Sequence, residues 1–520
     1  MKMKSNIYVR RYLTSLSLVI CQLSFGFAQQ GSGAYRYDDA TQLWRLSDNA
    51  AALRMDSSRN RGMAELQLEH RDGDYRRVQE GGQRNMLAFT TERYQNVGKY
   101  LAGYGRFSFN MDRTKDRAWA DVYRPYNATP YYPGSDVAGK YDQQSFAFTG
   151  ALGSVPVGHF RFGARLDYEV GDLSRLRDPR SRSELLDYRI VPSVAYTTGH
   201  HTFALAPYYQ RRKEKLVGIT TVQNDPNLAY YEMRGLEQAY GSVGAYKGFA
   251  RQWVDHRLGG SLSYGYRSGS LTSLTSLYMD YGSEDALEDE KKQPGSYTSL
   301  HYALASRHRI AAEGLLHAID LQMSLDQGYG DELKQQRVQT TDAQTGYSSY
   351  HYETLIAYKK RYQQRRFAAS VGYRLNFTQE QTVTSYAGLL FDCEYHHQKQ
   401  LLPTSTFDRQ RFGLTAEGGK SMLGGRLWAD LSAGYHFTGT DDSDLQLAEP
   451  GSAYAQQVLL PDMAYYTANY WQARATVKYL FPVTVKQVST TCYVKAYADY
   501  LRSNNSLDQK VVGICIGVEN

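Results

Sequence analysis

Hydrophobic and polar residues alternate one by one through most of the chain after its first 28 residues. The clearest example is residues 159–171, where one face is wholly apolar and the other is largely charged. A period of two is typical of a β-strand whose faces meet different surroundings. Strands of soluble sheets average about 5–6 residues, whereas a tilted transmembrane strand needs about 9–11. The length of this pattern therefore favours strands that cross a membrane.

The same alternation recurs along the chain, and the connections between the repeats alternate in length. Further repeats are residues 101–111, 367–377, 383–395, 427–437 and 471–481. Short turns at one end and long loops at the other are typical of outer-membrane barrels. In lipid an open sheet edge would leave backbone groups unpaired, so the sheet must close. The pattern predicts an all-β fold, a closed antiparallel transmembrane β-barrel of about 16–18 strands, because residues 350–362 fit either a strand or a loop extension.

The first 28 residues have the pattern of a secretory signal. Four positive residues precede a mostly apolar stretch over residues 12–27, and small residues Gly26 and Ala28 fit a cleavage site. We predict three regions: a signal peptide (1–28), a periplasmic or lumenal segment (29–61) and a barrel with long extracellular loops (62–520). The chain has a formal net charge of +7, and four of those charges lie in the signal. The remaining chain is nearly neutral, which argues against nucleic acid as a partner.

The polar faces of the predicted strands supply candidates for the inner wall of the barrel. A ring of one charge sign would select ions, whereas mixed signs can pair across neighbouring strands and fill the bore. Both alternatives stay open, because both signs are present. The lumen-facing candidates are Arg106, Arg161, Arg165, Asp167, Glu169, Arg374, Asp392, Glu394, Asp430 and Arg474.

The long loops are rich in aromatic residues, which offers a second set of candidates. Exposed aromatic rings suit stacking on sugars or docking of a protein. The alternative is that these rings pack the loops over the mouth of the barrel. The loop candidates are Tyr123, Tyr126, Tyr131, Tyr132, Tyr230, Tyr231 and Trp253.

Signals for catalysis or metal binding are weak. No G-x-S-x-G and no C-x-x-C motif occurs in the sequence. Asp392, Glu394 and His396 share one strand face and could bind zinc or iron with a neighbouring strand, but polar lumen residues are the favoured interpretation. His397 adds nothing to that cluster, since adjacent strand residues point to opposite faces. We therefore assign no catalytic residue, no metal and no cofactor.

The segment Leu43–Leu53 carries the most specific resemblance. Its residues Asn49-Ala50-Ala51-Ala52-Leu53 resemble the N-Ala-Ala-Leu signature of the long-chain fatty-acid transporter superfamily. This resemblance implies a short helix over residues 44–53, which Ser47 or Asp48 could cap, lying in the lumen or tethering the N-terminus from the periplasm.

As a whole, the chain resembles uncharacterised outer-membrane β-barrels of the Bacteroidota, which occur in uptake loci with TonB-dependent receptors. The resemblance implies the outer membrane of a Gram-negative bacterium, contact with its lipid and lipopolysaccharide, and a TonB-dependent receptor or a surface lipoprotein as candidate partner.

Three functions are compatible with this sequence. The first is transport across or uptake at the outer membrane, as a channel or as an accessory to a TonB-dependent complex. The second is a plugged barrel that anchors a lipoprotein or a glycan at the surface. The third, an outer-membrane hydrolase, ranks last because the sequence identifies no partner for its histidines, so we expect that the protein is not an enzyme.

Overall fold

The computed structural model describes residues 32–56, 60–125, 129–222, 228–243, 249–288, 291–439, 444–485 and 488–519. The predicted signal peptide, residues 1–28, and the loop candidate Tyr126 lie outside the described residues. Among the described residues, no helix has both the length and the apolar character required to cross a membrane.

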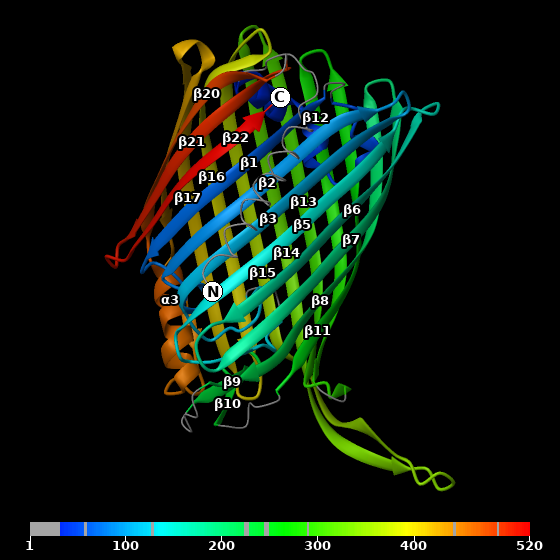
Figure 1. Ribbon diagram of the computed structural model, residues 1–520, viewed down its shortest axis with the longest axis vertical. Helices are drawn as coiled ribbons and strands as arrows, with labels where there is room; N and C mark the ends of the chain where they lie inside the picture. The colour runs from blue at the N-terminus through cyan, green and yellow to red at the C-terminus, as the bar shows by residue number, and fades with distance from the viewer. Residues whose placement is uncertain are drawn as a thin grey trace, which may run out of the picture.

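Eighteen antiparallel strands form one closed barrel (Figure 1). The first and last strands pair along their lengths, with Met63 opposite Glu519 and Gly73 opposite Gln509, so the sheet has no free edge there. This confirms the predicted closed barrel at the upper end of the expected strand number. The strands are β1 (Arg61–Gly73), β2 (Gln83–Val97), β3 (Leu101–Arg117), β5 (Gly139–Ser154), β6 (Phe160–Arg175), β7 (Arg180–Thr198), β8 (His201–Thr220), β11 (Arg251–Ser268), β12 (Leu271–Glu288), β13 (Gly295–Ala312), β14 (Leu315–Thr341), β15 (Ser348–Gln379), β16 (Thr382–Gln400), β17 (Ser405–Met422), β18 (Leu427–Phe437), β20 (Tyr470–Val485), β21 (Val488–Ser503) and β22 (Asp508–Glu519).

The two faces of the wall differ as the alternation predicts. On β6 the side chains of Phe160, Phe162 and Leu166 are exposed on the outside, while Arg161 and Arg165 between them are partly buried inside. Exposed apolar side chains recur on the outer face of most strands, among them Leu262, Leu277 and Phe391. An apolar belt of this extent is stable only against lipid. The barrel therefore spans a membrane.

The two ends of the barrel differ in their connections. One end has tight turns such as Gly199-His200, and β1 begins and β22 ends there. The opposite end carries the long loops and one long hairpin, formed by β14 and β15, which projects beyond the barrel (Figure 1). Residues 350–362, for which a strand and a loop extension were both open, are part of strand β15.

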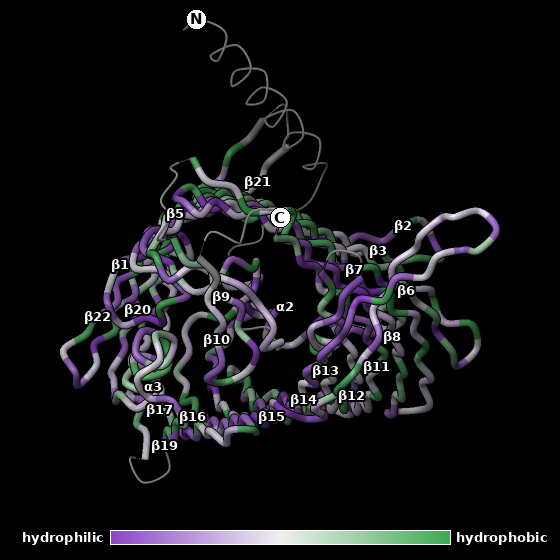
Figure 2. The backbone as a smooth tube through the Cα atoms, turned by 90° about the horizontal axis from the view of Figure 1, so that it is seen from below, coloured by the Kyte–Doolittle hydropathy of each residue, from purple (hydrophilic) through white to green (hydrophobic). Residues whose placement is uncertain are grey.

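The segment before β1 lies inside the barrel (Figure 2). Its contacts with Thr382 and Gly163, near two of the tight turns, place it at the short-turn end. It consists of α2 (Ser32–Thr41) and two short 3₁₀ turns, η1 (Leu43–Leu46) and η2 (Ala50–Ala52). The inner wall makes room for η2 with glycine. A Cβ built on Gly163 would lie 2.3 Å from the backbone nitrogen of Ala51. The backbones of the wall and of the segment are therefore in direct contact at this point, with no room for a side chain between them.

The predicted short N-terminal helix is present as α2, whereas residues 44–53 form two 3₁₀ turns in place of one continuous helix. Of the two predicted caps, Ser47 donates its hydroxyl to the carbonyl of Trp44. The side chain of Asn49 accepts from the backbone of Ala51 and donates to the carbonyls of Val194 and Leu205 on the wall. Asp48 forms an ion pair with Arg189 at 3.0 Å. These wall contacts outweigh helix propensity, and the regular helix lies earlier, in α2.

The long loops pack into a layer over one end of the barrel, which we call the loop cap. Its buried cluster includes Trp119, Tyr131, Tyr230, Trp253 and Tyr454. The indole of Trp119 lies against the rings of Tyr231 and Tyr454, with centroids 4.6 and 5.4 Å away. The smaller elements outside the wall are η3 (Val78–Glu80), β4 (Pro133–Gly134), β9 (Ala229–Met233), β10 (Ala239–Val243), η5 (Leu423–Gly425), β19 (Asp444–Gln446), η6 (Ala455–Leu459) and α3 (Leu460–Thr467).

Candidate functional site

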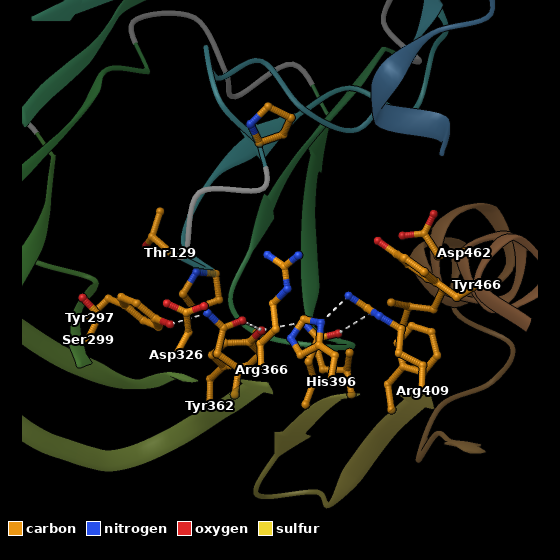
Figure 3. A pocket seen from close by; sticks show the side chains of 18 of the residues that line it. Thr129, Tyr297, Ser299, Asp326, Tyr362, Arg366, His396, Arg409, Asp462 and Tyr466 are labelled. Atoms are coloured by element: carbon orange, nitrogen blue, oxygen red, sulfur yellow. Dashed lines mark hydrogen bonds between the residues drawn. The ribbon is translucent and has the colours of Figure 1, made fainter. Parts of the chain in front are cut away.

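A cavity of about 500 Å³ lies beneath the loop cap, against the inner face of β13–β17 (Figure 3). We call it the loop-end cavity. Its size is within the range of pockets that hold small ligands. Its lining is mostly polar, with amides, tyrosine hydroxyls and charged groups. No cluster of three or more His, Cys, Asp or Glu residues suited to a metal ion occurs in the described part of the chain.

One row of side chains crosses the wall of this cavity. The register places them directly opposite one another on five adjacent strands. Because alternate residues of a strand face the same side, all five side chains point inward. Figure 3 shows three of them, Arg366, His396 and Arg409, rising from neighbouring strands into the cavity. In strand order from β13 to β17 the row is His301, Asp326, Arg366, His396 and Arg409.

Only some of the charges around the cavity are neutralised. Glu394 pairs with Arg366 at 3.2 Å and with Arg411 at 3.3 Å. The guanidinium of Arg409 instead contacts the Nδ1 atom of His396 and lies 3.7 Å from the centre of the Tyr466 ring. Among the described residues no carboxylate lies within 4.0 Å of Arg409. This side of the cavity therefore has an excess of positive charge.

Asp462 lies on α3, outside the membrane-spanning wall, beside Tyr466 and on the same side of the cavity as Arg409 (Figure 3). Burial raises the pKa of this carboxyl to about 7, although Arg77 and Arg409 act in the opposite direction. Nearby Glu80 raises its pKa further. A substantial fraction of Asp462 is therefore neutral at pH 7, and the carboxyl offsets the arginine charge only in part.

A second cavity, of about 400 Å³, lies nearer the short-turn end. We call it the turn-end cavity. Arg36, Asp39 and Ala40 of α2 form one side of it, and β13–β17 form the other. The α2 segment is held there by an ion pair between Arg36 and Asp430 at 2.7 Å, and by a hydrogen bond that the side chain of Arg309 donates to the carbonyl of Ala40.

On β13, β14 and β15 a single row of small side chains lies between the two cavities, and the same row continues on β16 and β17 as Glu394 and Arg411, which line the loop-end cavity. Ala303 lies opposite Ser324, and Ser324 lies opposite Ala368, on β13, β14 and β15. Asp326 and Arg366, each two positions from this row toward the loops, line the loop-end cavity. Two residues in the other direction, or about 7 Å by strand geometry, Gln322 and Ser370 line the turn-end cavity. We call the Ala303, Ser324 and Ala368 row the neck.

Most of the predicted lumen residues have partners inside the barrel. Their contacts join neighbouring strands or tie the wall to the N-terminal segment. Arg106 alone among the ten has no ion pair or side-chain hydrogen bond among the described residues. The pairs are Arg161 with Thr197, Arg165 with Asp167 and Asp48, Asp167 also with Arg189, Glu169 with Arg124, Arg374 with Glu417, Asp392 with His436, Glu394 with Arg366 and Arg411, Asp430 with Arg36, and Arg474 with Asp499.

Five of the six described loop aromatics lie within the packing of the loop cap. Tyr131, Tyr132, Tyr230 and Trp253 belong to its buried cluster, and Tyr231 packs against it. Tyr123 is buried in a separate cluster with Tyr141, Leu173 and Leu185. Of the six described candidates, only Tyr132 also lines the loop-end cavity. Its hydroxyl accepts a hydrogen bond from the side chain of Gln79 and forms another with the hydroxyl of Tyr454.

A family model covers most of the chain. It matches residues 50–520 and carries the description "Family of unknown function (DUF6850)". The chain belongs to this family. No curated protein matches the sequence.

Several solved structures are similar in shape at low sequence identity. They include the FrpB iron transporter from Neisseria meningitidis, at 9% identity and a TM-score of 0.41, covering 91% of this chain and 83% of that one. The copper transporter OprC has 10% identity and a TM-score of 0.40, and the match covers 88% of this chain and 81% of that one. The ferric-catecholate import receptor Fiu from E. coli K12 has 8% identity and a TM-score of 0.38, and the match covers 89% of this chain and 82% of that one. The expected likeness to fatty-acid transporters is found neither in the family match nor in these structures.

Several residues of the cavity cannot be recognised from the sequence alone. Arg366 and Arg409 lie 43 positions apart, and only strand pairing brings them to either side of His396. The neck residues Ser324 and Ala368 carry no chemical signal at all. The spacing of Arg409 and Arg411, two charged residues on one face of a strand, was the one pattern that could have indicated this wall.

Proposed function

We propose that this barrel lets a small polar solute cross the membrane along the inner face of β13–β17. The observation that carries the proposal is the arrangement of the two cavities, which lie in line on the same strands and, on β13–β15, have only the neck between them. Ala303, Ser324 and Ala368 carry small side chains, so the wall projects little into the bore along this row.

The position of the N-terminal segment supports this route. Its residues 48–51 fill the opposite side of the bore, where Asp48 pairs with Arg189 and Ala51 donates to Ser193. The segment approaches β13–β17 mainly through α2, at the edge of the turn-end cavity. The space along β13–β17 is therefore bounded by the loop cap at one end and by α2 at the other.

The proposed location is the outer membrane of a Gram-negative bacterium, as the short turns, long loops and closed antiparallel sheet suggest. Outer-membrane lipid and lipopolysaccharide would then surround the apolar belt. A source in the Bacteroidota stays a prediction. Within an uptake system the barrel would act as the passage itself or as an accessory to a TonB-dependent receptor. The proposal involves no chemical reaction, so the protein would not be an enzyme.

The test is solute-driven swelling of liposomes that contain the purified barrel. A panel of neutral and acidic monosaccharides should enter faster than in protein-free liposomes. Ala368→Trp places an indole in the neck, and we expect it to slow entry about tenfold by filling the space between the two cavities. Ala369→Trp is the matched control, because its side chain faces lipid on the same strand, and it should behave like the unmodified protein.

A second candidate function, a surface anchor, is favoured by the projecting hairpin. Beyond Glu332 of β14 and Tyr362 of β15 neither strand pairs with a barrel neighbour. Exposed apolar residues there include Tyr347, Leu355 and Ile356. This hairpin could hold a surface lipoprotein or glycan. The same swelling experiment separates the two functions, since an anchor requires no entry of any solute in the panel and no difference between the two tryptophan variants.

A further inference from the structure

The wall of the loop-end cavity contains hydrogen-bond donors without acceptors. The Nδ1 atom of His396 faces the Arg409 guanidinium, which can only donate, so the proton of a neutral His396 belongs on Nε2. That Nε2 atom has no partner among the described residues, and the side chain is 8% exposed. The Nε atoms of Arg409 and Arg411 also lack partners within the described chain.

These three donors belong to neighbouring inward positions. His396 lies directly opposite Arg409, and Arg411 is two residues further along the same face of β17. By strand geometry two such positions are about 7 Å apart, a separation that one multi-atom group can bridge. Buried donors without acceptors are costly. The charge of Arg411 is paired with Glu394, but that of Arg409 has no carboxylate partner among the described residues, and buried positive charge is costly unless it is neutralised. The missing group is therefore an acceptor that carries negative charge.

We propose that the loop-end cavity binds the oxyanion group of a solute, a carboxylate or a phosphate, through Arg409, Arg411 and His396. Arginine forks match both groups, because each presents several acceptor oxygens to the guanidinium. The rest of the solute would be hydroxylated, since the remaining lining offers amides and hydroxyls such as those of Gln364, Gln398 and Tyr297. This inference rests on the proposed function and names the class of solute for the same route.

The inference is tested by calorimetric titration of the purified full-length barrel in detergent. The probes are glucuronate, inorganic phosphate and glucose, the last being the neutral counterpart of glucuronate. We expect one or both anions to bind and glucose to bind at least about tenfold more weakly, because it lacks the charge-assisted hydrogen bonds. If glucuronate binds and phosphate does not, the solute is a carboxylate. The reverse result makes it a phosphate.

Variants locate the binding. Arg409→Gln with Arg411→Gln should weaken binding of the anion by about tenfold or more. Arg474→Gln is the matched control, a lumen arginine paired with Asp499 outside this cavity, and should leave the affinity unchanged. Arg409→Gln alone, whose lost charge is smaller, gives a second measurement if the double variant does not fold.

Two results would overturn the inference: neither anion binds the unmodified protein, or the folded double variant binds as well as the control. Its failure is distinguishable from failure of the proposed function, because titration needs no passage through the neck. Ala368→Trp should retain anion binding while solute entry slows. Entry of neutral sugars without any anion binding would leave the route intact and remove only the assigned solute class.

Discussion

Deleting residues 32–56 is expected to raise the ion conductance of the reconstituted barrel about tenfold, because a barrel of this strand number encloses an aqueous channel once its interior is cleared. The deletion removes the α2 side of the turn-end cavity and the contacts that hold it, including the pair of Arg36 with Asp430. It also removes Ala51 and its neighbours from the wall at Gly163. Conductance in planar bilayers measures the effect directly.

The matched control for this deletion is a loss of similar length outside the lumen. Replacing residues 333–357 of the projecting hairpin by a short turn leaves the bore untouched, since these residues extend past the pairing of β14 with β13. We expect the conductance of this control to equal that of the full chain. An unchanged conductance after deletion of residues 32–56 would contradict the view that this segment obstructs the lumen.

Trp119→Ala is expected to disrupt the loop cap while the barrel wall stays folded. The indole of Trp119 is fully buried and donates a hydrogen bond to Gln457, 3.1 Å away. Removing a buried tryptophan side chain costs about 3–5 kcal/mol. That loss falls on the loops alone, because the wall is held by its own strand pairing. Trypsin should then cleave the loops, while the barrel keeps the shifted gel migration of a folded, unheated sample.

Trp471→Ala supplies the comparison for the loop cap. Trp471 lies on the outer face of β20 with 44% of its surface exposed, so its loss leaves the loops unaffected. If the Trp119→Ala barrel resists trypsin as well as the Trp471→Ala barrel does, the loop cap does not depend on this packing.

The wall of the barrel could be predicted from the sequence because it is a local property. On β6 the alternation of Phe160, Arg161 and Phe162 already separates a lipid face from an inner face, and the structure keeps that separation. Closure of the sheet into a barrel is predictable because an open edge would leave backbone N–H and C=O groups without hydrogen-bond partners in lipid. Neither inference requires knowing which strands are neighbours.

The candidate site could not be predicted to the same extent, because it depends on register and on loop packing. Arg366, His396 and Arg409 meet only when three strands pair at one particular register. A shift of one residue would turn each side chain outward. Similarly, nothing local distinguishes the buried Tyr131 from an exposed recognition residue. Its burial arises from contacts with segments far away in the chain.

The central claim, a polar passage through the neck, is tested most directly by the accessibility of a cysteine at position 324. Cys393, Cys492 and Cys515 are first replaced by alanine, and the barrel is placed in liposomes. A small charged thiol reagent should modify Ser324→Cys. It should not modify Met323→Cys, because the side chain at position 323 faces lipid. Failure of Ser324→Cys to react in the folded barrel, with complete reaction after denaturation, would contradict the passage.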